Sequence, residues 1–388
     1  MRKVAIVDLP LHGGKAPAWL ISRMKRLGKA IITVILKEFS YRELLRRLAD
    51  PLWFQSLSYV LGYDWDSSGT TTVLTGVLRE ILSPDMGILV AGGKGKKALN
   101  TPNDIIRIGQ IFHFSEKKIQ ELLRISRLVA KVDNALIQDE HALYHHAMFI
   151  SKDGSWTIIQ QGMNPRLKTA RRYHWLSEII QSFTLDPHYG ILGNLKLPFV
   201  LNMATKESIE AQEVSLDLVR DGIRTIKRDL ERLISTTMRI KKLTSFFGEE
   251  KEENVILRKI KPIHIRLLPT KINWTALERA YEIQPKTYEE FILLRGIGPG
   301  TIRALALIAE LIYDAKLCWK DPIRYTFAVG GKDGVPYPVN IRRMEKVAEF
   351  LERAIEEARI GKTEKIIMLK KLSKLLGRTN DQTGEIMD

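Results

Sequence analysis

Cysteine is nearly absent from this sequence, since Cys318 is the only one among 388 residues. A single cysteine excludes a disulfide within one chain and a zinc site built from cysteines. Apolar runs long enough to span a membrane, about eighteen residues, are also missing, and the N-terminus has no signal-peptide pattern. A phosphate-binding loop with the spacing Gly-x-x-x-x-Gly-Lys-Ser/Thr does not occur either. These absences predict a cytoplasmic protein with no membrane partner.

Acidic residues are fewer than basic residues in this sequence. The chain has 61 lysines and arginines against 45 aspartates and glutamates, a formal net charge of +16. Such an excess favours an anionic partner. Nucleic acid is the first choice, because cations that neutralise phosphates release counterions and drive binding without sequence preference. An anionic membrane surface is the weaker alternative.

One glycine-rich turn lies between two apolar helical patterns. Residues 288–294 have the pattern of a helix, a Gly-Ile-Gly turn follows, and residues 301–313 have the pattern of a second helix. Glycines in the turn would let a phosphate approach the main chain, and the amides that begin the second helix would face the anion. Ile297 would anchor the turn to the interior. The alternative is an ordinary corner between two helices.

The arrangement resembles the helix-hairpin-helix module with which many DNA repair and replication proteins hold the phosphate backbone. The residues that we expect to contact DNA there are Arg295, Gly296, Ile297, Gly298, Gly300, Thr301 and Arg303.

The remaining patterns predict an α+β protein. Residues 3–7 and 30–36 have the length and composition of strands, and residues 41–49 those of a helix that ends before Pro51. Ser115 has the position of a helix cap before a long apolar pattern. Asp153-Gly154 lies between two apolar runs, 147–151 and 156–161, which predicts a β-hairpin.

Length and composition predict three parts in the chain. Residues 1–204 would form a mixed α/β domain, 205–253 a long helix with a charged connector, and 254–388 a helical DNA-binding domain. Apolar residues between 209 and 240 recur at spacings of three and four, which gives one continuous helix an apolar seam. Packing within the chain and self-association are both open for that seam.

Two groups of residues are candidate ligands for Mg²⁺ or Mn²⁺. Asp64 and Asp66 lie beside hydroxyl side chains and could hold a divalent cation, although they could equally cap the following helix. If the helix from Ser115 continues, Asp133, His141 and His145 fall along one of its faces, at spacings that suit a metal site with open positions. The alternative is a polar helix end. Glu140 lies close by as a further acid–base candidate.

Two further motifs suit a nucleic-acid site. Gln160 and Gln161 end the second strand of the predicted hairpin and could orient a water or a phosphate. Arg171 and Arg172 precede three consecutive rings, and such a mixture of guanidinium groups and rings suits a surface that holds phosphates and stacks on bases. A solvated surface helix is the alternative.

Five strings together resemble the family known as domain of unknown function 763. They are residues 8–14, 65–71, 160–164, 170–175 and 330–334. The resemblance runs from the N-terminus to about residue 340. It implies that the five strings belong to one architecture and supplies no activity.

The function predicted from these features is a metal-dependent nuclease that acts on structured or single-stranded DNA through contacts limited to the backbone. A non-catalytic DNA-binding or scaffold protein of DNA repair is the alternative from a different class. A third possibility is a base-excision glycosylase, for which Asp321 lies near the expected distance past the glycine turn.

Overall fold

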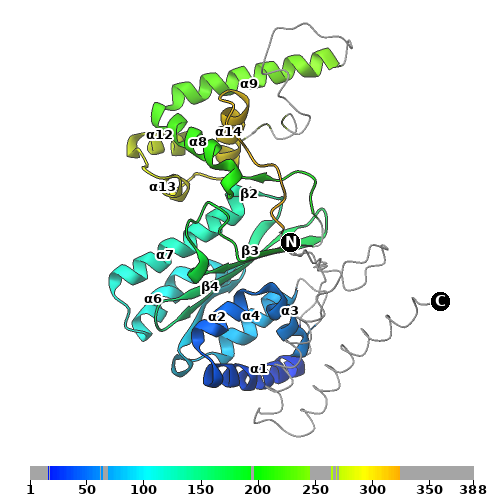
Figure 1. Ribbon diagram of the computed structural model, residues 1–388, viewed down its shortest axis with the longest axis vertical. Coiled ribbons are helices and arrows are strands. Elements are labelled where there is room, and N and C mark those ends of the chain that lie inside the picture. The colour runs from blue at the N-terminus through cyan, green and yellow to red at the C-terminus, as the bar shows by residue number, and fades with distance from the viewer. Residues whose placement is uncertain are drawn as a thin grey trace, which may run out of the picture.

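The computed structural model describes residues 16, 18–61, 63, 69–193, 196–244, 264, 268 and 271–323, with residues 19 and 237–244 described by their backbone alone. Within these ranges the chain forms an antiparallel sheet between two layers of helices, followed by a group of helices above one end of the sheet (Figure 1). The α+β class predicted from the sequence is confirmed. The predicted strand 3–7, Asp64, Asp66 and the charged connector 248–253 lie outside the described residues.

The central sheet has five antiparallel strands. Their order is β1 (Ile88–Lys94), β3 (Ala142–Ser151), β4 (Trp156–Asn164), β5 (Thr169–Leu176) and β6 (Gly190–Gly193). Strands β3 and β4 form the predicted hairpin, in which Asp153 Oδ1 accepts hydrogen bonds from Ser155 N at 3.0 Å and Ser151 Oγ at 2.6 Å. A second, small sheet pairs β2 (Ile137–Gln138) with β7 (Leu201–Asn202).

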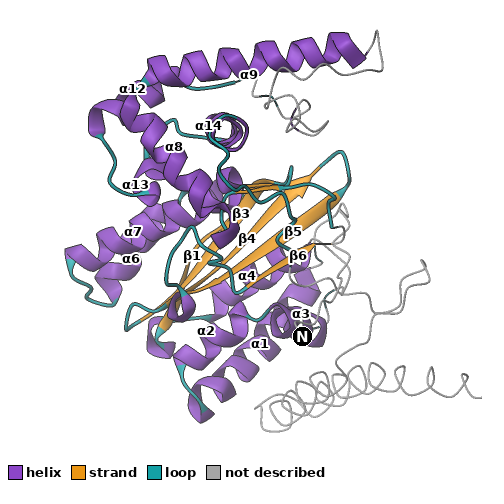
Figure 2. Ribbon diagram, turned by 45° about the horizontal axis from the view of Figure 1, so that its top comes forward, coloured by secondary structure: helices purple, strands orange, loops and turns teal. Residues whose placement is uncertain are grey.

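One face of the sheet is covered by the first four helices, α1 (Ala18–Glu38), α2 (Tyr41–Ala49), α3 (Pro51–Val60) and α4 (Gly69–Ile81) (Figure 2). Helix α2 has the predicted bounds, and Ser40 Oγ caps it by accepting from Glu43 N. The strand predicted at residues 30–36 is wrong, because this run lies inside α1. Its isoleucines continue a helical spacing from Met24 and Leu27, and Ile31 and Ile35 are buried against the other helices.

The opposite face carries α5 (Lys96–Leu99), α6 (Thr101–Ile111) and α7 (Glu116–Lys131). Ser115 caps α7 as predicted, since its hydroxyl accepts from Lys118 N. The predicted continuation of this helix through His141 and His145 is wrong. A π-helical turn (η2, Val132–Leu136) ends the helix, and the chain passes through β2 into β3.

The helices of the last part are α8 (Ile209–Asp221), α9 (Ile223–Thr244), α12 (Trp274–Ile283), α13 (Tyr288–Leu293) and α14 (Pro299–Leu311). The single helix predicted for residues 205–245 is wrong, because it breaks at Gly222, whose φ is +101°. Short 3₁₀ turns lie at Pro84–Met86, Ser177–Ile179 and Lys206–Ser208. Val219 and Ile226, two residues of the apolar seam predicted between 209 and 240, are buried in the hydrophobic core of the same chain.

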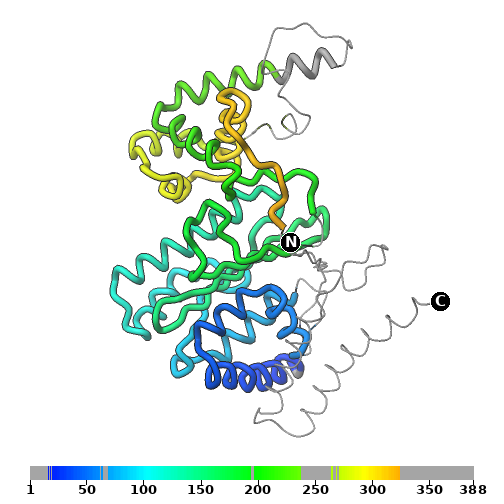
Figure 3. The backbone as a smooth tube through the Cα atoms, viewed as in Figure 1, coloured from blue at the N-terminus to red at the C-terminus, as the bar shows by residue number. Residues whose placement is uncertain are grey.

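The last helices share one hydrophobic core with the sheet. Trp175 of β5, Leu216 of α8, Leu277 of α12 and Leu305 of α14 belong to the same buried cluster. After α14 the chain runs back toward the sheet (Figure 3). There Cys318 forms an antiparallel β-bridge with Asn202 of β7. Among the helices that the structure describes, none has both the length and the apolar character needed to cross a membrane.

Candidate functional site

The turn between α13 and α14 is held from both sides. Thr287 Oγ1 accepts a hydrogen bond from Glu290 N at 3.2 Å and so caps α13. Gly296 then adopts a φ of +94°, which favours glycine. Ile297 is only 1% exposed and packs into the shared core, as predicted for the anchor of the turn. The turn therefore has a fixed position relative to the sheet.

Helix α14 begins without a capping side chain. Gly298 is its N-cap residue, and Pro299, which has no N–H, follows. The first hydrogen bond of the helix runs from Ile302 N to Gly298 O at 3.0 Å. The amide N–H groups of Gly300 and Thr301 lie in the first turn of α14 and therefore have no acceptor within the helix. The helix dipole favours negative charge at this end.

The three glycines around this turn have different roles. A Cβ on Gly296 would lie 2.8 Å from Asn273 Nδ2, and one on Gly300 would lie 2.1 Å from Lys271 O. A Cβ on Gly298 would meet no heavy atom within 4 Å. Gly296 and Gly300 therefore permit close packing, whereas Gly298 leaves open space in front of α14.

A hollow of about 700 Å³, which we call the turn hollow, opens at this place. It is lined by Lys271, Ile272, Asn273, Trp274, Thr275, Gly296, Gly298, Pro299, Gly300, Thr301 and Arg303. Lys227 places its Nζ 5.2 Å from the ring centroid of Trp274. The hollow thus combines uncapped amides with basic side chains and no acidic lining residue.

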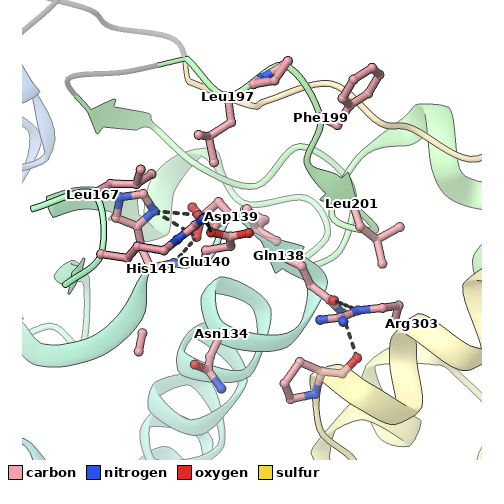
Figure 4. Close-up of a pocket in the computed structure, with 15 residues that line it drawn as sticks. Asn134, Gln138, Asp139, Glu140, His141, Leu167, Leu197, Phe199, Leu201 and Arg303 are labelled. Atoms are coloured by element: carbon pink, nitrogen blue, oxygen red, sulfur yellow. Dashed lines mark hydrogen bonds and ion pairs between the residues drawn. The ribbon is translucent and has the colours of Figure 1, made fainter. Parts of the chain in front are cut away.

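A second hollow of about 700 Å³, the sheet-edge pocket, adjoins the first (Figure 4). The two share Pro299 and Arg303 in their linings. Gln138 joins them, because its Nε2 donates to Pro299 O at 2.9 Å and its Oε1 accepts from Arg303 Nε at 2.7 Å. The lining residues are Asn134, Ile137, Gln138, Asp139, Glu140, His141, Ala142, Arg166, Leu167, Leu197, Pro198, Phe199, Leu201, Pro299 and Arg303.

A buried ion network fixes the floor of the sheet-edge pocket. Asp139 accepts from Arg171 Nη1 at 2.8 Å and from the Tyr173 hydroxyl at 2.6 Å, and Arg171 Nη2 donates to Asp321 at 2.5 Å. Burial alone would raise the pKa of Asp139, but the charge of Arg171 and the bonds from His141 and Tyr173 outweigh it and lower the pKa to about 2. Asp139 is therefore a carboxylate throughout the neutral range.

The pKa of Asp139 gives a testable pH dependence. A carboxyl whose pKa falls from 3.8 to about 2 on folding adds stability above its unfolded pKa and loses it as the pH falls through the folded value. We expect the gap in unfolding free energy between the wild type and Asp139→Asn to shrink by about 2 kcal/mol between pH 4 and pH 2. Denaturant titrations across this range would measure it. A gap that stays constant with pH would contradict the assigned pairing.

Glu140 forms the outer rim of the pocket, beside this buried floor. Its φ is +63°, in the left-handed region, and its carboxylate lies 2.6 Å from Arg166 Nη2. Both side chains are about half exposed or more, so the pair lies in solvent at the pocket mouth. His141 directly precedes β3, and its Nε2 lies 3.0 Å from Thr169 Oγ1.

The residues predicted to hold a metal are not brought together. Asp133 lies on the α7 side of the sheet and accepts from His188 Nε2 at 2.5 Å, Trp175 Nε1 at 3.0 Å and Gln160 Nε2 at 2.5 Å. His145 lies on the α4 side, with Nε2 at 3.1 Å from Thr75 Oγ1. The predicted metal face through Asp133, His141 and His145 is therefore wrong, because the helix expected to carry them ends before the two histidines.

The environments of these groups support structural roles. Burial, followed by the charges of His146, Lys94 and Arg172, lowers the pKa of His145 to about 3, so this ring is neutral at physiological pH. Gln161 accepts from Thr71 Oγ1 and donates to the Tyr144 hydroxyl. In the part of the chain that the structure describes, no group of three or more His, Cys, Asp or Glu side chains could hold a metal ion.

The basic aromatic run does not form a surface, and this prediction is wrong. Arg171 and Arg172 lie on β5 and are 1% and 0% exposed. Arg172 points to the α3 side, where Nη2 donates to Gln55 Oε1 at 2.6 Å and the guanidinium lies 4.9 Å from the Phe54 ring centroid. Burial lowers its pKa to about 9. Neither arginine reaches a DNA strand outside the protein.

Asp321, the candidate for a glycosylase, is enclosed as well. Its carboxylate accepts from Arg171, from Leu197 N at 2.7 Å and from Ile323 N at 3.1 Å. It lines neither the turn hollow nor the sheet-edge pocket. These contacts tie the segment after α14 to the sheet, which is a structural role.

Sequence reasoning missed several residues that line the two hollows. Gln138, Phe199, Lys271 and Trp274 belong to segments separated by up to 136 positions, 274 − 138, and no local spacing links them. Arg303 and the glycine turn were identified because they lie within one short motif. Residues that the fold alone brings together have no signal in a single sequence.

The comparisons with known proteins give one finding. No curated protein and no solved structure matches the chain. The pattern of one protein family, described as "Protein of unknown function (DUF763)", matches residues 5–339, which is most of the 388 residues. The chain therefore belongs to this family, as the resemblance of its five sequence strings predicts.

Proposed function

We propose that the protein binds the sugar–phosphate backbone of DNA at the start of α14, in the turn hollow, without reading base sequence. The observation that carries the proposal is the uncapped first turn of α14, which opens into a hollow beside Lys271 and Arg303. Amides that have no partner in the helix, together with the helix dipole, suit a phosphate oxygen. The net charge of +16 supports the same partner.

The glycine pattern supports contact through the main chain. Gly298 leaves the space in front of the amides open, whereas Gly296 and Gly300 hold the turn against Asn273 and Lys271. Phosphate contacts of this kind position a protein on DNA and carry no sequence information. The turn would then act as the helix-hairpin-helix that its sequence resembles.

The proposed activity is binding alone. The metal-dependent nuclease remains a prediction, because Asp64 and Asp66 lie outside the described residues and Asp133, His141 and His145 do not converge. Main-chain amides and basic side chains can hold a phosphate at α14 without Mg²⁺ or Mn²⁺. Self-association through the 209–240 seam likewise stays a prediction.

The salt dependence of DNA binding tests the proposal. Lys227, Lys271, Arg295 and Arg303 lie at or near the turn, besides Lys131 and Arg279, which already donate hydrogen bonds to the carbonyls of Ile297 and Arg295. We take the first four as the cations available to phosphates. Since each neutralised phosphate contributes about −0.9 to the slope of log K against log salt, we expect a slope of roughly −3 to −4. Labelled duplexes of two unrelated sequences should give the same curve in an anisotropy titration.

Parallel incubations with Mg²⁺, Mn²⁺ or EDTA separate binding from cleavage. Retained and uncut DNA under every condition agrees with the proposal, and cleavage would establish the nuclease instead. A chain that binds neither duplex nor single-stranded DNA at low salt would refute the proposed function.

A further inference from the structure

We infer that the sheet-edge pocket binds an unpaired nucleobase of the strand whose backbone lies in the turn hollow. The inference rests on the proposed function, because the turn hollow must hold the backbone for a base to reach the pocket. It adds a substrate preference, since only DNA with an unpaired nucleotide can fill both sites.

The two hollows adjoin at the start of α14. Pro299 and Arg303 belong to both linings, and Gln138 is hydrogen-bonded to each of them. A phosphate at the amides of Gly300 and Thr301 therefore lies at the border of the pocket. A nucleotide attached to that phosphate can place its base inside without the backbone leaving α14.

The walls of the pocket suit a planar ring. Ile137 and Leu201 of the small sheet contribute apolar side chains to the lining, as do Leu197 and Phe199 of the segment before β7. Figure 4 shows Leu197, Phe199 and Leu201 along this segment. Phe199 is 54% exposed, so its ring is accessible to a ligand that enters the pocket. An exposed ring beside apolar walls is the arrangement on which bases stack in proteins that bind single strands.

The charges in the pocket favour a base over a phosphate. The lining carries two carboxylates, Asp139 at the floor and Glu140 at the mouth, and two guanidinium groups, Arg166 paired with Glu140 and Arg303 shared with the turn hollow. These charges balance, so the pocket has no excess of positive charge to attract a phosphate. Glu140 can instead accept a hydrogen bond from the exocyclic amino group that adenine, cytosine and guanine carry. The turn hollow is lined by basic side chains and no acidic one, so we expect the phosphate there and the base in the sheet-edge pocket.

Paired DNA cannot use the pocket, because its bases are stacked and held in the duplex. Binding should therefore be tighter for a duplex with a short single-stranded overhang than for a blunt duplex of equal charge. The decisive comparison is between an overhang with bases and the same overhang built from abasic sugars, which keeps every phosphate and removes only the rings.

The experiment measures both overhangs with the wild-type chain, Phe199→Ala and Phe39→Ala. Phe39 is a matched control, because it is 50% exposed and lies at the end of α1 in the opposite helix layer. We expect the wild type and Phe39→Ala to prefer the overhang with bases about tenfold. Phe199→Ala should lose this preference and should bind the abasic overhang and the blunt duplex like the wild type.

The outcomes separate the two proposals. If wild type and Phe199→Ala show the same preference for bases, or if the wild type shows none, the pocket does not bind a base, although binding of blunt duplex still supports the proposed function. If the wild type binds none of the DNAs, the proposed function itself fails. Equal weakening of all DNAs by Phe199→Ala would also overturn the inference, because the effect would not depend on the base.

Discussion

Replacing Arg171 with methionine is expected to lower the free energy of unfolding by about 3–5 kcal/mol. Methionine keeps much of the side-chain length but removes the charge that Asp139 and Asp321 share. Both carboxylates are at most 1% exposed, so they would remain buried without a counterion. Denaturant unfolding at neutral pH would measure the loss.

The matched control is Arg166→Met. Arg166 also pairs with a carboxylate, Glu140 at 2.6 Å, but its side chain is 65% exposed and its partner's 49%. Exposed pairs contribute at most about 1 kcal/mol, so this variant should unfold almost like the wild type. If both variants lost the same small amount, the Arg171 network would not have the structural role assigned to it.

The Arg171 network also links the fold to the site. Asp321 follows α14 in the chain, and Arg171 connects it to Asp139 at the floor of the sheet-edge pocket. Loss of this link would weaken the attachment of the return segment, which the backbone hydrogen bonds from Val200 N to Trp319 O and from Asn202 N to Cys318 O also hold. A residue that lines neither hollow thus helps to position the segment after α14.

Local signals explain what the sequence predicted well. Helix α2 has the expected bounds because Ser40 caps its start and Pro51 cannot continue it. The β3–β4 hairpin was predictable from Asp153-Gly154, where Gly154 adopts a φ of +81°. The turn before α14 belongs to the same class, because its glycines and Ile297 lie within a few residues of one another.

The wrong predictions of secondary structure concern segments in which tertiary packing or a break in a helix determined the structure. The β-branched run at residues 30–36 lies in α1, because burial of Ile31 and Ile35 among other helices outweighs the weak strand preference of the run. Gly222 carried a usable signal for the break between α8 and α9. The π-helical turn that ends α7 has no such signal, and it moved His141 and His145 out of the predicted site.

The sequence alone also did not show which charged side chains are buried. Arg171 and Arg172 have a composition that fits an exposed nucleic-acid surface, yet both lie inside the sheet layer. The alternation along β5 sends Arg171 and Arg172 to opposite faces, each toward its own buried partner. Charge in a sequence indicates a partner, but only the fold shows that these partners are internal.

Replacing Gly298 with aspartate is expected to weaken DNA binding about ten- to a hundredfold, since hydrogen bonds to a charged group contribute about 1.5–3 kcal/mol. Gly298 has φ −138° and ψ −176°, an extended conformation that suits an N-cap aspartate. The new carboxylate would accept from the amides that open α14 and would occupy the place of the phosphate. It would also repel the DNA.

The same change should leave the fold intact or slightly more stable. Aspartate at an N-cap is better than glycine by a few tenths of a kcal/mol, and its charge suits the helix dipole. A Cβ at this position meets no heavy atom within 4 Å, so no neighbour has to move. Stability and binding are thus expected to change in opposite directions, which separates loss of the site from loss of the fold.

Gly76→Asp is the matched control for the added charge. Gly76 lies in α4, on the far side of the sheet from the turn, and a Cβ there also meets nothing within 4 Å. The variant has the same net charge as Gly298→Asp, so any effect of overall charge on DNA binding appears in both. Gly298→Asn would cap α14 without the charge and should bind DNA with intermediate affinity.

The most direct test of the account is one anisotropy titration of a labelled duplex at low salt with wild type, Gly298→Asp and Gly76→Asp. We expect wild type and Gly76→Asp to bind with similar affinity and Gly298→Asp to bind about ten- to a hundredfold more weakly while unfolding at the same or higher denaturant concentration. Wild-type affinity in Gly298→Asp would show that the start of α14 does not hold the DNA backbone.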